Sequence, residues 1–241
     1  MILTHLTKVG HELSALTVER TLDSLYIQPI LDTLRSQNPT TPFVDGSQTK
    51  NGVFDTVSSQ TLYLFIDLKT SGEETWQQVL TDLQPLLNAG YLSTTDGQTL
   101  NAGPVTVIGT GNTPFTYFSP EPATASSPRY TFFDAPLSSL TEAAYLGVTA
   151  LTAPVASADL GAVTGPLTWS RGLNTMQLAR VQEAVKVAQA RGIVARFWDA
   201  PAWPVQTRNA LWRQLWDAGA GLLNVDDLAA AAGFWEGAGS A

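Results

Sequence analysis

TLYLFIDLKT, residues 61–70, is the stretch that decides the fold. It is nearly all apolar and rich in β-branched and aromatic residues, which is typical of a strand covered on both faces of a parallel sheet. A helical pattern follows at once over residues 73–89, with apolar side chains three and four positions apart. Gly90 ends that helix. A strand followed directly by a helix is the repeating unit of an α/β fold.

The same alternation recurs along the chain. Further strand patterns occupy 104–111, 130–136, 193–200 and 221–227, and a weaker one lies near 150–154. Helical patterns occupy 21–37, with Pro29 starting a second piece, a stretch capped by Asn174, and a stretch opened by PAWP at 201–204. No glycine-rich dinucleotide or phosphate-loop motif and no Gly-x-Ser-x-Gly is present. Polar residues follow the predicted strands, where barrel enzymes build their sites, so a parallel barrel is favoured.

The amino-acid composition limits the classes of partner and chemistry that the protein can have. The 241 residues carry 13 basic and 21 acidic side chains, a net charge of −8, and no Lys/Arg cluster, which argues against a nucleic-acid partner. No apolar run reaches the ~18 residues of a membrane-spanning helix. Cysteine is absent, so thiolate and disulfide chemistry is excluded. The sequence assigns no compartment.

Asp67 and Lys69 stand out within the first strand. Alternation places them with Phe65 on one face, and the leucine and isoleucine positions on the other. A carboxylate and an ammonium rarely enter an apolar strand unless they are paired or used. Two interpretations stay open: a structural ion pair, or a metal-binding carboxylate beside a cation that holds an anionic group.

Four motifs in order resemble one family. They are GHE (10–12), LFIDLKT (64–70), RFWDAPAWP (196–204) and LLNVDDL (222–228). Together they resemble the fungal phospholipase C-like phosphodiesterases of the altered inheritance of mitochondria protein 6 family, which are related to glycerophosphodiester phosphodiesterases. The resemblance implies one (β/α)8 barrel domain over 1–228, with a flexible tail over 229–241. It also implies hydrolysis of a phosphodiester, such as a glycerophosphodiester or a phospholipid head group, with a divalent cation, usually Mg²⁺.

The resemblance assigns roles to three residues near the start of the chain. His11 matches a catalytic histidine in its Gly-His-acid setting. Asp67 matches a metal ligand, and Lys69 matches the lysine that contacts the phosphate. These residue types suit the reaction, because a cation neutralises the anionic diester and a histidine can protonate the departing alkoxide.

The later motifs supply candidates for substrate binding. Trp198 resembles an aromatic wall near the leaving-group pocket, and Asn224 resembles the polar residue at the end of the last strand. Arg196 shares a face with Trp198 and could reach a phosphate, although a buried ion pair is as good an interpretation. Asp199 is a weaker candidate, since a turn role beside Pro201 also explains it.

The chain departs from the family pattern before the Gly-His-acid triplet. The family has a first histidine and a Glu-x-Asp metal pair there, whereas residues 1–10 read MILTHLTKVG and contain no acid. His5 lacks the family context and is not a convincing substitute. We therefore expect the first strand, first helix and second strand to be missing, as in a fragment or an incomplete gene model. We also expect weak or no activity from the chain as given.

Two other functions remain. One is a barrel without catalysis that binds a phosphorylated ligand through Lys69 and Trp198. The other is a glycoside hydrolase that uses two of Asp67, Asp134 and Asp199, at a carboxyl separation set by its stereochemistry. Against the latter, a lysine beside Asp67 has no required role in such an enzyme.

Overall fold

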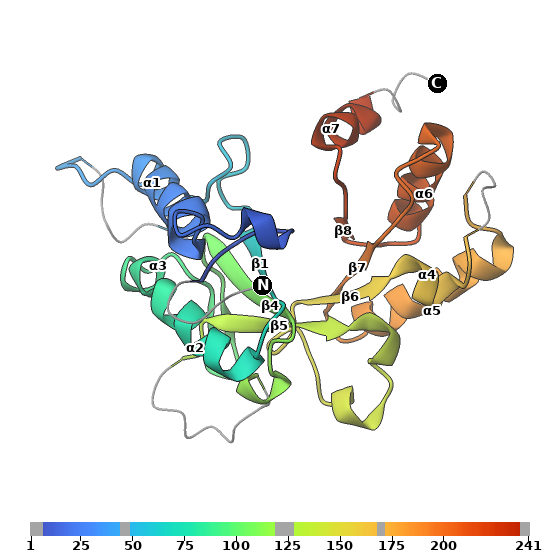
Figure 1. Cartoon of the computed structure of the whole chain (residues 1–241), viewed down its shortest axis with the longest axis horizontal. Helices are drawn as coiled ribbons and strands as arrows, with labels where there is room; N and C mark the ends of the chain where they lie inside the picture. Colours follow the sequence, from blue (N-terminus) through green and yellow to red (C-terminus); the bar gives the residue numbers. More distant parts are fainter. Residues whose placement is uncertain (1–6, 44–48, 119–127, 168–171, 237–241) are drawn as a thin grey trace. The chain divides into compact units, whose positions relative to one another are not determined.

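The computed structural model describes residues 7–43, 49–118, 128–167 and 172–236 (Figure 1). The chain forms two compact units, Met1–Phe133 and Asp134–Ala241. Among the described residues, the strands of the main sheet are ordered β1-β4-β5-β6-β7-β8, and every pairing in it is parallel. An α/β fold with a parallel sheet is therefore confirmed. The closed (β/α)8 form and the missing first elements stay predictions, as does the single domain over 1–228.

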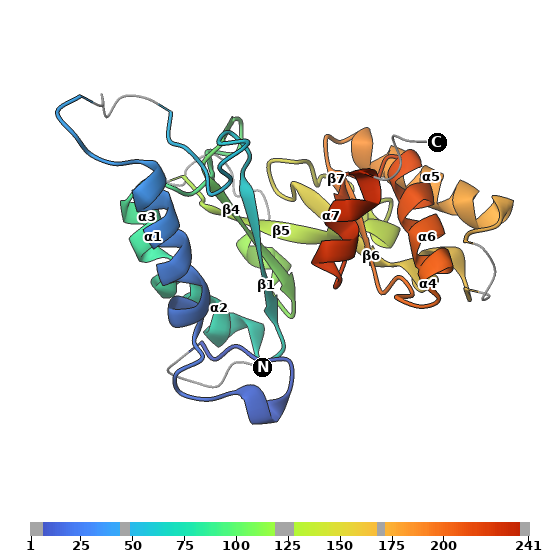
Figure 2. The ribbon, with the colours of Figure 1, turned by 90° about the horizontal axis from the view of Figure 1, so that it is seen from above.

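The first unit packs three helices against a parallel strand pair. Figure 2 shows α1, α2 and α3 on one side of β1 and β4. The strands of this unit are β1 Leu62–Leu68, β4 Val105–Gly111 and the small antiparallel pair β2 Thr94–Thr95 and β3 Leu100–Asn101. The helices are α1 Gln28–Gln37, α2 Gly72–Asp82 and α3 Gln84–Asn88, with η1 Leu13–Ala15, η2 Asp23–Ile27 and η3 Phe115–Tyr117 as short helical turns.

The core of this unit follows the predicted periodicities. Leu68 of β1 and Val79 of α2 are fully buried, and Trp76 is 1% exposed, with its ring centroid 5.5 Å from that of Phe118 in an edge-to-face arrangement. Burial of side chains of this size contributes about 1.5–3 kcal/mol each. The single helix predicted over 73–89 is instead two helices, because Pro85 has no N–H with which to continue the first one.

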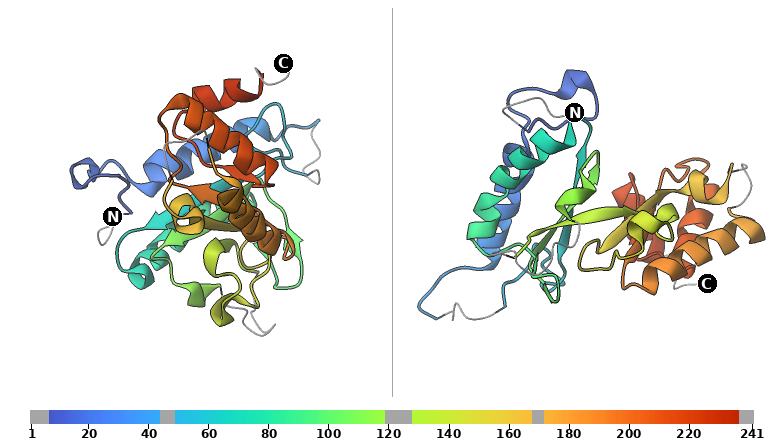
Figure 3. Two further views of the ribbon diagram at one scale, coloured as in Figure 1. Left: turned by 90° about the vertical axis from the view of Figure 1, so that its right-hand side faces the viewer. Right: turned by 90° about the horizontal axis from the view of Figure 1, so that it is seen from below.

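The second unit has short strands and longer helices. Figure 3 shows its orange and red helices gathered around the strands. The strands are β5 Thr131–Pro136, which belongs to this unit from Asp134 onward, β6 Val155–Asp159, β7 Val194–Trp198 and β8 Leu222–Leu223. The helices are α4 Leu160–Thr164, α5 Thr175–Gln189, α6 Val205–Asp217 and α7 Leu228–Glu236, with turns η4 Leu137–Ser139 and η5 Ala143–Tyr145.

Capping residues define the helix starts of the second unit. Asn174 caps α5, as predicted, and forms a capping box with Gln177. The Asp227 carboxylate accepts the Ala230 N–H at 2.9 Å and caps α7. The weak strand expected near 150–154 lies instead at Val155–Asp159, where alanine and serine blur the apolar pattern.

The segment expected as a flexible tail contains most of α7. Phe234 meets Trp212 edge to face at 5.6 Å between ring centroids, and Trp235 lies 5.0 Å from Trp216. These aromatic contacts attach α7 to α6. Within the described residues, no helix is long and apolar enough to cross a bilayer.

Candidate functional site

A short pairing near the start of the described chain forms the first wall of the site. The Val9 N–H donates to the Arg20 carbonyl at 2.8 Å, and the Leu22 N–H donates to the Thr7 carbonyl at 2.7 Å. Thr7 is 1% exposed, and its hydroxyl donates to the Asp82 carboxylate of α2. The two ends of residues 10–19, here called the histidine loop, are thereby held against the helices.

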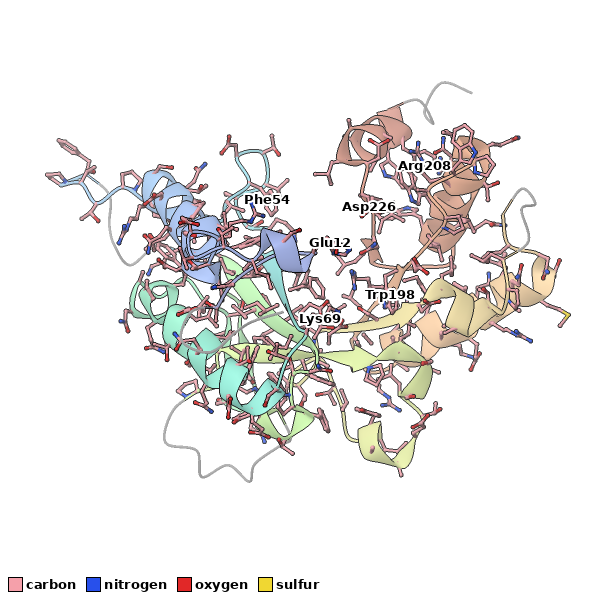
Figure 4. All side chains as sticks on the ribbon, in the orientation of Figure 1. Glu12, Phe54, Lys69, Trp198, Arg208 and Asp226 are labelled. Atoms are coloured by element: carbon pink, nitrogen blue, oxygen red, sulfur yellow. The ribbon has the colours of Figure 1, made fainter. Side chains whose placement is uncertain are left out.

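A pocket of about 620 Å³ lies between the histidine loop and β1. Figure 4 labels Glu12 on the loop and Lys69 just beyond β1. Apolar side chains such as Leu22, Tyr26 and Phe65 form part of its lining. Its charged and polar lining residues are Lys8, His11, Glu12, Arg20, Asp67 and Lys69. The pocket thus contains all three residues that the sequence assigns to chemistry in this unit.

Asp67 and Lys69 lie on one face of β1, as alternation predicts. Their Oδ2 and Nζ atoms are 2.6 Å apart, and their side chains are 46% and 62% exposed. An ion pair this open to water contributes only about 0–1 kcal/mol to folding. A ligand can therefore replace one member of this ion pair at a small cost in folding free energy, and the fold depends little on the pair.

The end of β4 holds the end of β1 in place. The Asn112 N–H donates to the Leu68 carbonyl at 2.8 Å, and Gly111 pairs with Leu68 in register. Gly111 has φ +66°, and a Cβ there would overlap an Asp67 carboxylate oxygen and lie 2.5 Å from the Leu68 carbonyl oxygen. Only glycine fits this approach, which sets the position of Asp67.

Sequence reasoning assigned no role to three charged residues of the pocket. Glu12 is exposed on the histidine loop beside His11. Lys8 and Arg20 lie just before and just after that loop in the chain. The Thr17 hydroxyl lowers the pKa of Glu19, with Lys8 as a smaller contributor, so Lys8 acts electrostatically on Glu19. The pairing of Lys8 with Thr21 is non-local, and no periodicity signals it.

The donor set of the pocket limits what metal it can hold. Among the residues that the structure describes, no three His, Cys, Asp or Glu side chains gather into a metal-binding group. Asp67 and Glu12 are two carboxylates in the pocket lining. Mg²⁺ is commonly held by one or two carboxylates together with waters and substrate phosphates. These residues therefore fit an ion that the substrate helps to hold, rather than a closed protein site.

The other predicted residues lie in the second unit, at the ends of β7 and β8. The Arg196 guanidinium donates to the Ser157 hydroxyl at 3.1 Å and to the Asn224 side-chain carbonyl. Trp198 is 42% exposed and two residues along the same strand. Asp199 is exposed and has φ +59°, as expected of a residue that turns the chain after a strand. The structure therefore brings the predicted residues together as two groups, one in each unit. His5 lies outside the described residues.

Comparison with known proteins identifies the family. The model of the AIM6-like phosphodiesterase domain matches residues 4–134, which include every residue of the pocket. The chain is 45% identical over 230 residues to an altered inheritance of mitochondria protein 6 homolog of Arthroderma benhamiae, covering 94% of this chain and 70% of that protein. Identity is 34% to altered inheritance of mitochondria protein 6 of Eremothecium gossypii and 33% to that of Saccharomyces cerevisiae, covering 94% and 91% of this chain.

The chain spans 59% of the length of each of these last two relatives. No solved structure matches it. With a family model over more than half of its residues and a relative of 45% identity over most of them, the chain belongs to the AIM6-like phosphodiesterase domain family.

Proposed function

We propose that the chain hydrolyses a phosphodiester at a low rate and that the pocket beside β1 is its site. The observation that supports this is the convergence of His11, Asp67 and Lys69 on one pocket from two segments of the chain. A histidine, a carboxylate and a lysine supply a proton donor, an anionic anchor and a cation for phosphate. The family resemblance assigns the same three roles to these positions.

The charges of the pocket suit an anionic substrate. Lys69 is 62% exposed, so a phosphate oxygen can replace the Asp67 carboxylate beside its ammonium at little cost. Water then attacks the phosphorus and loses a proton to the solvent, the P–O bond to the leaving alcohol breaks, and protonated His11 gives its proton to the departing oxygen. The products are a phosphomonoester and an alcohol.

A divalent cation such as Mg²⁺, when bound, would neutralise charge on the phosphoryl oxygens. Asp67 and Glu12 are the pocket carboxylates that would hold it. We expect dependence on Mg²⁺ to be strongest when substrate is present, because the phosphate would complete the set of ligands.

The proposal extends to the fold and to the substrate. Parallel pairing throughout the main sheet supports the (β/α)8 type that the resemblance implies. Trp198 and Asn224, with Arg196 and Asp199 as weaker candidates, are proposed to contact the substrate. Trp198→Ala should then raise KM with less effect on kcat. The proposed substrate class is a small phosphodiester, such as a glycerophosphodiester or a phospholipid head group.

Hydrolysis of bis(4-nitrophenyl) phosphate and of a glycerophosphodiester, with and without Mg²⁺, would test the function. His11→Ala should lower kcat about 10²- to 10⁴-fold, the usual contribution of a general acid. Asp67→Asn and Lys69→Met should each lower kcat/KM. Asp32→Asn and Lys186→Met are matched controls, because both side chains are exposed on helices and neither lines the pocket.

Each outcome decides between the alternatives. Activity that persists in all three pocket variants would refute the assignment of this pocket as the active site. Binding of inorganic phosphate that depends on Lys69, without hydrolysis by the wild type, would replace the hydrolase with a phosphate-binding protein.

A further inference from the structure

Arg20 is a pocket residue to which no role has been assigned. Its carbonyl accepts the Val9 N–H, which fixes its backbone at the end of the histidine loop. Arg20 lines the same pocket as His11 and Lys69. The hydrogen bond between Val9 and Arg20 involves only the backbone of Arg20. The fold therefore fixes the position of the Arg20 backbone beside the pocket, while among the described residues no hydrogen bond or ion pair that holds the fold uses its guanidinium.

The three cations of the pocket differ in their partners. Lys69 is paired with Asp67 at 2.6 Å, whereas Lys8 is in no ion pair among the described residues. Arg20 makes no ion pair with any residue in the described part of the chain. An arginine that lines a pocket and has no carboxylate partner is suited to an anion that the pocket binds.

We propose that Arg20 binds the phosphate group of the substrate through its guanidinium. This rests on the proposed function of the pocket and adds a substrate-binding residue to it. The planar guanidinium presents paired N–H groups that match two phosphate oxygens at once, whereas a lysine contacts phosphate as a point charge. Arg20 therefore orients the phosphate between the histidine loop and β1, and Lys69 neutralises its charge from the strand.

Two measurements on Arg20→Gln and Arg20→Lys test the proposal. The first is titration of the protein with inorganic phosphate by calorimetry, and the second is the steady-state kinetics of bis(4-nitrophenyl) phosphate hydrolysis with Mg²⁺. Arg20→Gln should raise both the Kd for phosphate and KM about 10- to 100-fold, as expected for loss of a charged hydrogen-bonding group. Arg20→Lys should recover only part of the lost affinity, because lysine keeps the positive charge but lacks the paired N–H groups of the guanidinium.

Arg35→Gln is the matched control, because Arg35 is an exposed arginine of α1 that pairs with Asp32 and does not line the pocket. An equal effect of Arg35→Gln would overturn the proposal, as would full recovery by Arg20→Lys. If Lys69→Met impairs hydrolysis but Arg20→Gln changes neither KM nor the phosphate Kd, the proposal for Arg20 fails and the proposed function stands. If the wild type hydrolyses nothing but binds phosphate in an Arg20-dependent way, Arg20 is retained and the hydrolase is rejected. A wild type that neither binds phosphate nor hydrolyses the diester refutes both.

Discussion

Replacement of Gly111 by alanine tests how the fold positions Asp67. Gly111 ends β4 in the left-handed region, at φ +66°, opposite Leu68 of β1. An added Cβ would overlap an Asp67 carboxylate oxygen and lie 2.5 Å from the Leu68 carbonyl oxygen. The carboxylate can rotate away, but the carbonyl is backbone and already accepts the Asn112 N–H at 2.8 Å. The ends of β1 and β4 must therefore separate.

Two costs add in this variant. A left-handed conformation costs a non-glycine residue about 1–2 kcal/mol. Forcing an extra carbon into a filled space typically costs about 1–3 kcal/mol more. The free energy of unfolding should therefore fall by about 2–5 kcal/mol in Gly111→Ala. Gly97→Ala isolates the first cost, because Gly97 has φ +87° and its added Cβ would meet nothing within 4 Å. It should lose only about 1–2 kcal/mol.

Urea unfolding followed by circular dichroism would measure both variants against the wild type. Gly111→Ala should also lower kcat/KM for a phosphodiester in its folded fraction, since Asp67 is displaced, whereas Gly97→Ala should not. If Gly111→Ala is no more destabilising than Gly97→Ala, the close approach of β4 to β1 is not as the structure has it, and the reasoning is refuted.

Three further predictions concern stability. Trp76→Leu should lower the free energy of unfolding by about 2–4 kcal/mol in urea titrations, because the side chain is 1% exposed and a smaller one leaves a cavity; a loss below 1 kcal/mol would contradict this packing. Asp227→Ala removes both the α7 cap and the 3.0 Å contact with Arg208 and should cost about 1–2 kcal/mol, whereas Asp227→Asn keeps a cap acceptor and should cost about 0.5 kcal/mol. Equal losses would argue against the cap. Hydrogen bonds from the backbone N–H groups of Thr99 and Gln98 lower the pKa of Asp96 from 3.8, so its carboxylate stabilises the fold above that pH and loses this effect as pH falls through the lower folded value. The stability difference between wild type and Asp96→Asn should therefore shrink below about pH 4, and a difference that grows there would contradict the shift.

Local patterns were sufficient to predict most elements. The strand over 61–69 and the helix after Asn174 were predicted within a residue or two, because side-chain periodicity and capping chemistry act over a few residues. Alternation also placed Asp67 and Lys69 on one face correctly. The strand at Val155–Asp159 was displaced in the prediction because alanine and serine carry little periodic signal.

The sequence by itself thus determined the α/β order of elements and the side chains on each face of β1, since these depend on residues close together in the chain. It also determined the family, since four motifs occur in the family's order. Only the tertiary structure decided which charges share the pocket. Pairing of Val9 with Arg20 brings Glu12 and Arg20 to the same pocket as Asp67, across more than forty residues of intervening chain. The tertiary structure also decided that the Asp67–Lys69 ion pair is open to water. Contacts of this kind follow from the packing of distant segments, whose energetics no local pattern records.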